Sequence, residues 1–203
     1  EALRAALSAA QDSRGSRKGW ALYDAQADKA HKRAFSLLAD LRRAIETDTG
    51  LSLCFQPRID FRTGRCVGAE ALLRWTHPTL GPISPGEFIP VAEETGLIVP
   101  IGQYVLSQAL EMTAKWSGQR RWPFKIAVNL SPRQFRDENL ASFIQEKLHE
   151  TGVSGRNLEL EITEGVLMDD TPAIAINLRL LSEMGVRLSI DDFGTGYSSL
   201  GYL

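Results

Sequence analysis

One stretch organises this sequence: Val186-Arg187-Leu188-Ser189-Ile190-Asp191-Asp192-Phe193-Gly194-Thr195-Gly196-Tyr197-Ser198-Ser199. It predicts a buried strand that ends in two carboxylates and opens into a loop rich in Gly and Ser. Because successive strand side chains point to opposite faces, the aliphatic residues share one face and Asp191 lies on the other. Asp192 can join Asp191 only where the pleat gives way to the loop. Two adjacent acids at the end of a strand suit a divalent cation, and a solvated Asp-Asp turn is the competing interpretation.

Composition narrows the class of protein. The chain has 203 residues, of which 43% are hydrophobic and 24% charged, and a formal net charge of −2. These values are typical of a soluble globular protein and give no sign of a surface for polymeric nucleic acid. No apolar run approaches the ~20 residues of a membrane span, so we expect a cytoplasmic location, with a membrane anchor elsewhere in the parent protein left open. Cys54 and Cys66 lack metal-ligand spacing and are expected to be free thiols.

The chain divides into three parts. Residues 1–28 predict a basic helix and a short strand that are too small to form a core of their own. Residues 29–48 predict a charged amphipathic linker helix, and residues 49–203 form the main domain. The chain begins without Met and stops soon after a loop, so we expect a C-terminally truncated fragment of a longer protein.

From Leu51 onward strands and helices alternate. The tight Thr63-Gly64 turn makes the first two strands antiparallel neighbours. Two capping boxes, at Ser84 to Glu87 and Ser131 to Gln134, predict helix starts. Repeated strand–helix units with short connections favour a parallel α/β sheet or barrel, of which about the first five strands are present. The predicted strands are residues 51–61, 67–75, 125–130, 158–164 and 186–191.

Each of the later strands has an aliphatic face and an opposite face with one polar side chain near the strand's end. In a barrel that second face points inward, and the C-terminal strand ends form the mouth of the active site. We therefore expect convergence of Glu70, Asn129, Glu161, Asp191 and Asp192. Four carboxylates and an amide would repel one another unless cations lie between them.

All-oxygen ligands without His or Cys favour Mg²⁺, Mn²⁺ or Ca²⁺ over Zn²⁺. Two such ions ~3.5–4 Å apart can activate a water and stabilise both oxygens of an in-line displacement at phosphorus. Arg74 shares a strand face with Glu70 and is well placed to meet a substrate phosphate. A salt bridge between Arg74 and one of the acids is the alternative.

Five motifs in order resemble the EAL-domain cyclic di-GMP phosphodiesterases, and the resemblance runs from about Ala34 to Leu203. Residues 1–25 are similar to the last helix and strand of a GGDEF domain, but they contain none of its catalytic motif. The five motifs are Gln56-Pro57, Glu70-Ala71-Leu72-Leu73-Arg74-Trp75, Asn129-Leu130-Ser131, Glu161-Ile162-Thr163-Glu164 and the stretch from Asp191 to Leu200.

The resemblance implies a TIM-like (β/α) barrel whose first strand is antiparallel. It implies hydrolysis of cyclic di-GMP to linear pGpG with two Mg²⁺ or Mn²⁺ ions. Gln56 and Arg74 would contact the dinucleotide, and Glu164 would brace the loop from Phe193 to Leu200. The implied catalytic acids are Glu70, Glu161, Asp191 and Asp192, and the implied metal ligands are these four with Asn129.

The same resemblance implies a homodimer through the EAL domain and a sensory or GGDEF domain in the same chain. A lysine, a glutamate and a glutamine of the family would lie after residue 203. A non-hydrolysing cyclic di-GMP receptor is the first alternative, and another Mg²⁺-dependent barrel enzyme that acts on a phosphorylated metabolite is the second.

Overall fold

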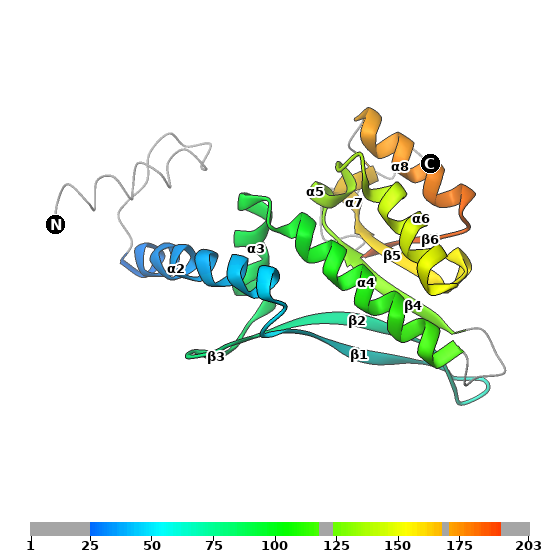
Figure 1. The fold of residues 1–203 in the computed structure, drawn as a ribbon, viewed down its shortest axis with the longest axis horizontal. Helices are drawn as coiled ribbons and strands as arrows, with labels where there is room; N and C mark the ends of the chain where they lie inside the picture. The colour runs from blue at the N-terminus through cyan, green and yellow to red at the C-terminus, as the bar shows by residue number, and fades with distance from the viewer. Residues whose placement is uncertain (1–24, 118–123, 168–170, 192–203) are drawn as a thin grey trace.

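A six-stranded sheet forms the centre of the molecule in a computed structural model that describes residues 25–117, 124–167 and 171–191 (Figure 1). The hydrogen-bonded order is β1-β2-β4-β5-β6, and β3 pairs with β2 off this path. The strands are β1 (Leu51–Asp60), β2 (Arg65–His77), β3 (Gly81–Ile83), β4 (Lys125–Leu130), β5 (Leu158–Thr163) and β6 (Arg187–Asp191).

The strand directions are those of an incomplete TIM-like barrel. β1 runs antiparallel to β2, whereas the β2–β4, β4–β5 and β5–β6 pairs are all parallel. The predicted barrel with an antiparallel first strand is therefore confirmed. β3 is absent from the sequence prediction because three residues are too few to show an alternating pattern.

Helices cover one face of the sheet, with α4, α6 and α8 side by side along it (Figure 1). The aliphatic strand residues Ile126, Val128 and Leu160 are buried on this face, together with Ile101 and Leu106 of α4. The other face is left for the polar side chains. The helical elements are α2 (Ala25–Thr47), α3 (Pro85–Thr95), α4 (Ile98–Ser117), α5 (Pro132–Phe135), α6 (Leu140–Thr151), the 3₁₀ turn η1 (Gly155–Asn157), α7 (Glu164–Leu167) and α8 (Pro172–Glu183).

The two predicted capping boxes have different outcomes. At α5 the box is confirmed, because the Ser131 hydroxyl accepts from the Gln134 amide at 3.4 Å and the Gln134 side chain accepts from the Ser131 amide at 2.9 Å. At α3, Ser84 is the N-cap residue but its side chain makes no capping hydrogen bond, so the box predicted there is wrong. The Glu87 carboxylate instead pairs with Arg33 of α2.

The β1–β2 hairpin turns as the sequence predicts. Gly64 has a φ of 65°, which a residue with a side chain adopts only at a cost, and its amide donates to the Asp60 carbonyl at 2.8 Å. Cys54 is exposed and Cys66 is half-buried, and both are free thiols as predicted. Across the three described ranges, no helix is long and apolar enough to cross a membrane.

Asn177 joins α8 to the segment between α5 and α6. This fully buried amide donates to the carbonyls of Phe135 at 2.8 Å and Asp137 at 2.9 Å, and accepts from the Ala141 amide at 3.3 Å. We expect Asn177→Leu to lower the free energy of unfolding by about 2–4 kcal/mol, because it leaves buried backbone groups without partners. Thermal unfolding checks this, with exposed Arg179→Ala on the same helix as the control, and an equal effect of the two variants would contradict it.

Candidate functional site

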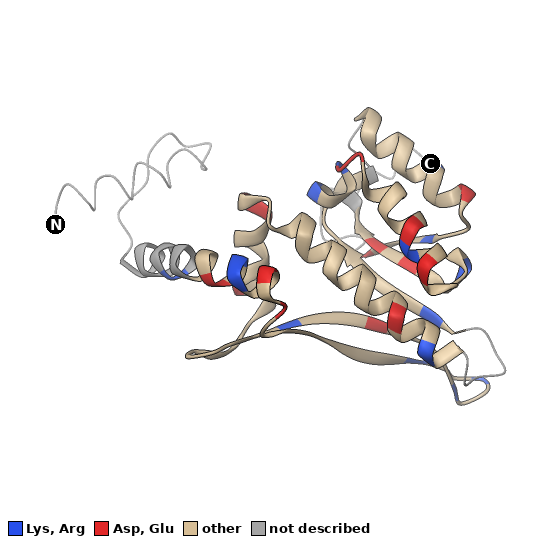
Figure 2. Ribbon diagram, in the orientation of Figure 1, with Lys and Arg blue, Asp and Glu red and all other residues tan. Residues whose placement is uncertain are grey.

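The inward face of the sheet brings the predicted polar residues to neighbouring strands. Asn129 of β4 lies beside Glu161 of β5, and Glu70 of β2 lies opposite Gln56 of β1. Asp191 follows at the end of β6, beside Thr163 of β5. Figure 2 shows the acidic positions of β2 and β5 on strands whose other face carries helices.

Asn129 connects two of these strands directly. Its side-chain amide donates to a carboxylate oxygen of Glu70 at 2.8 Å, which joins β4 to β2 across the site. The same contact occupies one oxygen of Glu70. It fixes the amide so that the Asn129 carbonyl oxygen, the atom able to coordinate a cation, points away from Glu70.

Glu161 has a cationic partner that the sequence reasoning missed. Arg58 of β1 extends its guanidinium between two carboxylates, with Nη1 3.0 Å from Glu159 and Nη2 bonded to Glu161. Burial raises the pKa of Glu161, Arg58 opposes this shift, and the negative charges of Glu70 and Asp191 add to it. These effects show that Glu161 lies in a crowded acidic environment that favours the entry of positive charge.

Glu159 of β5 and Ser189 of β6 extend this arrangement toward the N-terminal ends of their strands. Glu159 shares its strand face with Glu161, and the Ser189 hydroxyl donates to Glu159 at 3.2 Å. Alternation along the strand predicts that Glu159 shares a face with Glu161, but the prediction gave a role only to the acids at the strand ends. Arg58, two residues after Gln56, could have been found by following the first strand in the same way.

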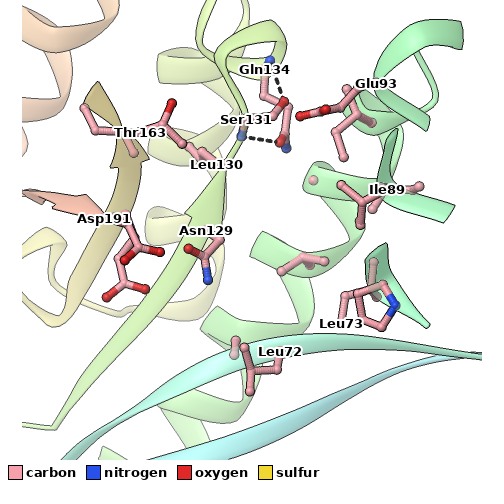
Figure 3. Close-up of a pocket in the computed structure, with 18 of the residues that line it drawn as sticks. Leu72, Leu73, Ile89, Glu93, Asn129, Leu130, Ser131, Gln134, Thr163 and Asp191 are labelled. Atoms are coloured by element: carbon pink, nitrogen blue, oxygen red, sulfur yellow. Dashed lines mark hydrogen bonds between the residues drawn. The ribbon is translucent and has the colours of Figure 1, made fainter. Parts of the chain in front are cut away.

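A cavity of about 340 Å³ opens beside the strand ends. Asn129, Glu161 and Asp191 line one side, and Figure 3 shows Asn129 and Asp191 directed into the same space from β4 and β6. The opposite wall is apolar and comes from α3 and α4, with lining residues that include Ile89, Ile98, Ile101 and Val105. The cavity therefore combines carboxylates on one side with an apolar wall on the other.

Arg74 also lines this cavity. Its Nη1 donates to the Leu73 carbonyl at 2.8 Å, and in the part of the chain that the structure describes it forms no ion pair with an acid. Within the described residues, the structure therefore differs from the alternative interpretation, a salt bridge between Arg74 and one of the acids. Gln56 is exposed on the inward face of β1, opposite Glu70.

Polar and tightly packed contacts hold the rim of the cavity. Arg133 donates to the carbonyls of Glu93 at 2.7 Å and Glu94 at 3.2 Å, which ties the end of α3 to the segment after β4. Gln134 packs against Gly102 of α4, where a Cβ would lie 1.6 Å from its Nε2, so any larger residue there would displace the Gln134 amide. Figure 3 shows Ser131 and Gln134 joined by their hydrogen bonds at this rim.

Some predicted residues lie outside the described part of the structure. They are Asp192 and the loop from Phe193 to Leu200, while Glu164 begins α7 and only its backbone is described. Within the described residues, no group of three or more His, Cys, Asp or Glu side chains is close enough to hold a metal ion. The donor chemistry nevertheless fits Mg²⁺ or Mn²⁺, because carboxylate and amide oxygens from adjacent strands face one interior.

Comparison with known proteins adds an independent result. A family model described as the EAL domain matches residues 38–203. Cyclic di-GMP phosphodiesterase PA2567 of Pseudomonas aeruginosa is 45% identical over an alignment of 206 positions that covers 99% of this chain and 34% of that protein. The bifunctional diguanylate cyclase/cyclic di-GMP phosphodiesterase MucR of the same organism is 43% identical over 187 residues, 92% of this chain and 27% of that protein. The chain thus spans about a third or less of the length of these curated relatives.

Two solved structures of similar proteins share the fold of this chain. The PaMucR phosphodiesterase in its c-di-GMP complex aligns with a TM-score of 0.75 and 46% identity, over 82% of this chain and 67% of that one. The EAL enzyme Bd1971, in its form with bound cAMP and cyclic-di-GMP, aligns with a TM-score of 0.76 and 29% identity, over 85% of this chain and 48% of that one.

Proposed function

Because this chain belongs to the EAL-domain family, we propose that its barrel binds cyclic di-GMP and hydrolyses it to linear pGpG in a reaction that requires divalent cations. One observation carries the proposal. Asn129, Glu161 and Asp191, from successive strands, line a single cavity, and Asn129 links them to Glu70.

Family members of this kind generally depend on divalent metal ions. We infer two Mg²⁺ or Mn²⁺ ions here, and the residues that would hold them are Glu70, Asn129, Glu161, Asp191 and Asp192. Such ions, when bound, lower the pKa of a coordinated water and offset negative charge at phosphorus.

The protein's own side chains would orient the substrate. Arg74 lies on the cavity wall with guanidinium donors that suit a phosphate, and Gln56 stands across from Glu70. Ile89, a partly buried residue of the cavity lining, offers an apolar surface against which a guanine base can pack. Glu164, at the start of α7, would brace the loop that follows β6.

The proposal extends to the parent protein. The match to PA2567 covers 99% of this chain, so it includes residues upstream of the family match at residue 38. We infer from the sequence resemblance that residues 1–28 are the tail of a preceding GGDEF-like domain, and MucR is named as a bifunctional diguanylate cyclase/cyclic di-GMP phosphodiesterase. A homodimer through the EAL domain and a cytoplasmic location complete the proposal.

The test measures turnover and binding in the full-length protein. We expect pGpG to form from cyclic di-GMP with Mg²⁺ or Mn²⁺ and to be lost in excess chelator, as measured by chromatographic separation of product from substrate. Hydrolysis that persists undiminished in chelator would contradict the metal-dependent mechanism. Tight binding without hydrolysis in any metal would identify a receptor instead of an enzyme.

A further inference from the structure

Arg58 lies on the inward face of the barrel wall. It is paired in register with Gly68 of β2, where a Cβ would lie 2.6 Å from the Lys125 carbonyl oxygen, so no side chain stands beside Arg58 on that strand. The pairing of β1 with β2 shifts register between Arg58 and Ile59, and such irregularities re-aim the neighbouring side chain. The local backbone therefore directs the Arg58 side chain toward Glu159 and Glu161.

The Arg58 guanidinium contacts two carboxylates, each through a different nitrogen. Nη1 lies 3.0 Å from Glu159, whose side chain is 13% exposed, and Nη2 bonds Glu161, whose side chain is 12% exposed. Glu159 has a second partner in the Ser189 hydroxyl at 3.2 Å. Glu159 is thus a fixed anchor for Arg58, whereas Glu161 also faces the cavity.

We propose that Arg58 is an internal counter-cation, which neutralises Glu161 when no metal ion is bound and remains with Glu159 when a metal ion takes Glu161. The inference rests on the proposed metal-dependent function and concerns a positioning residue of that site. A guanidinium and a metal ion compete for the negative charge of the same carboxylate, so binding of the ion weakens the Arg58–Glu161 contact. Glu159 stabilises the arginine after this exchange.

Because Arg58 and the metal ion compete for Glu161, substitutions of Arg58 and of Glu159 should change the metal affinity in opposite directions. Arg58→Met removes the competitor and leaves the acids of the metal-free site to repel one another, so cations bind more tightly. Glu159→Gln removes the anchor and leaves Arg58 dependent on Glu161, so cations bind more weakly. A purely structural role would weaken binding in both variants.

The experiment titrates the full-length protein with Mn²⁺ alone and measures the dissociation constant by isothermal calorimetry. We expect Arg58→Met to lower this constant roughly 3- to 10-fold and Glu159→Gln to raise it by a similar factor, as expected for a partly buried ion pair. In the double variant the effect of Glu159→Gln should disappear, because that effect acts through Arg58. Arg62→Gln, exposed at the tip of the same hairpin, is the matched control and should leave the constant unchanged.

Thermal unfolding gives a second readout. Arg58→Met should lower the unfolding midpoint in chelator, and saturating Mn²⁺ should narrow the difference from wild type. Unchanged or weaker Mn²⁺ binding in Arg58→Met, or a Glu159→Gln effect that persists in the double variant, overturns the inference. If wild type hydrolyses cyclic di-GMP normally in that case, only the role of Arg58 fails. Absence of Mn²⁺ binding and turnover in wild type overturns the proposed function as well.

Discussion

Replacement of Glu161 by Gln is expected to reduce hydrolysis of cyclic di-GMP by roughly 100- to 1,000-fold, the scale for loss of one group that stabilises charge in a transition state. Glu161 lies among other charged side chains. It lies beside Asn129 and lines the cavity. Burial raises its pKa, Arg58 acts to lower it, and the negative charges of Glu70 and Asp191 raise it further. Gln keeps the shape of the side chain but removes the charge that a cation would require.

The effect should fall on the turnover number and on the metal concentration needed for half-maximal rate. Initial rates of pGpG formation across a Mn²⁺ series measure both. Glu138→Gln makes the same chemical change at an exposed position away from the site and should retain wild-type rates. Near-normal turnover of Glu161→Gln with unchanged metal dependence would show that Glu161 is not a metal ligand.

Most of the site's placement follows from one local rule. Alternation along each strand put the aliphatic residues under the helices and left Glu70, Asn129, Glu161 and Asp191 for the interior. The structure has Asn129 and Glu161 side by side and Asn129 bonded to Glu70, as that rule predicts. The bounds of β4, Lys125–Leu130, also match the prediction, because a capping box marks the following helix.

The Arg58 contacts depend on information that a local pattern does not contain. Arg58 and Glu161 are 103 positions apart, and their pairing needs the antiparallel first strand, the register shift after Arg58 and the reach of a long side chain together. The failed box at Ser84 has a similar cause. Glu87 has a competing partner, Arg33, from a helix that local sequence does not place next to it.

Replacement of Gly155 by Ala is expected to destabilise the domain by about 3 kcal/mol, at the upper end for overpacking of a filled interior. Gly155 is buried at the start of η1, just before β5. A Cβ at this position would lie 2.1 Å from the Met184 carbonyl oxygen and 3.4 Å from Cγ2 of Val186. The oxygen belongs to backbone at the end of α8, so it cannot rotate away as a flexible side chain would.

Relief of this clash requires the end of α8 or the start of β5 to move. β6 begins at Arg187, three residues after Met184, so the strain would reach the strand that supplies Asp191. We therefore expect the thermal midpoint to fall by roughly 6–12 °C, as converted for a domain of this size. Gly86→Ala in α3 is the control, because the nearest atom to its Cβ would be the Ser84 hydroxyl at 3.8 Å. That control should be neutral or stabilise by about 0.5 kcal/mol, and a Gly155→Ala midpoint equal to it would contradict the close packing of α8 against η1.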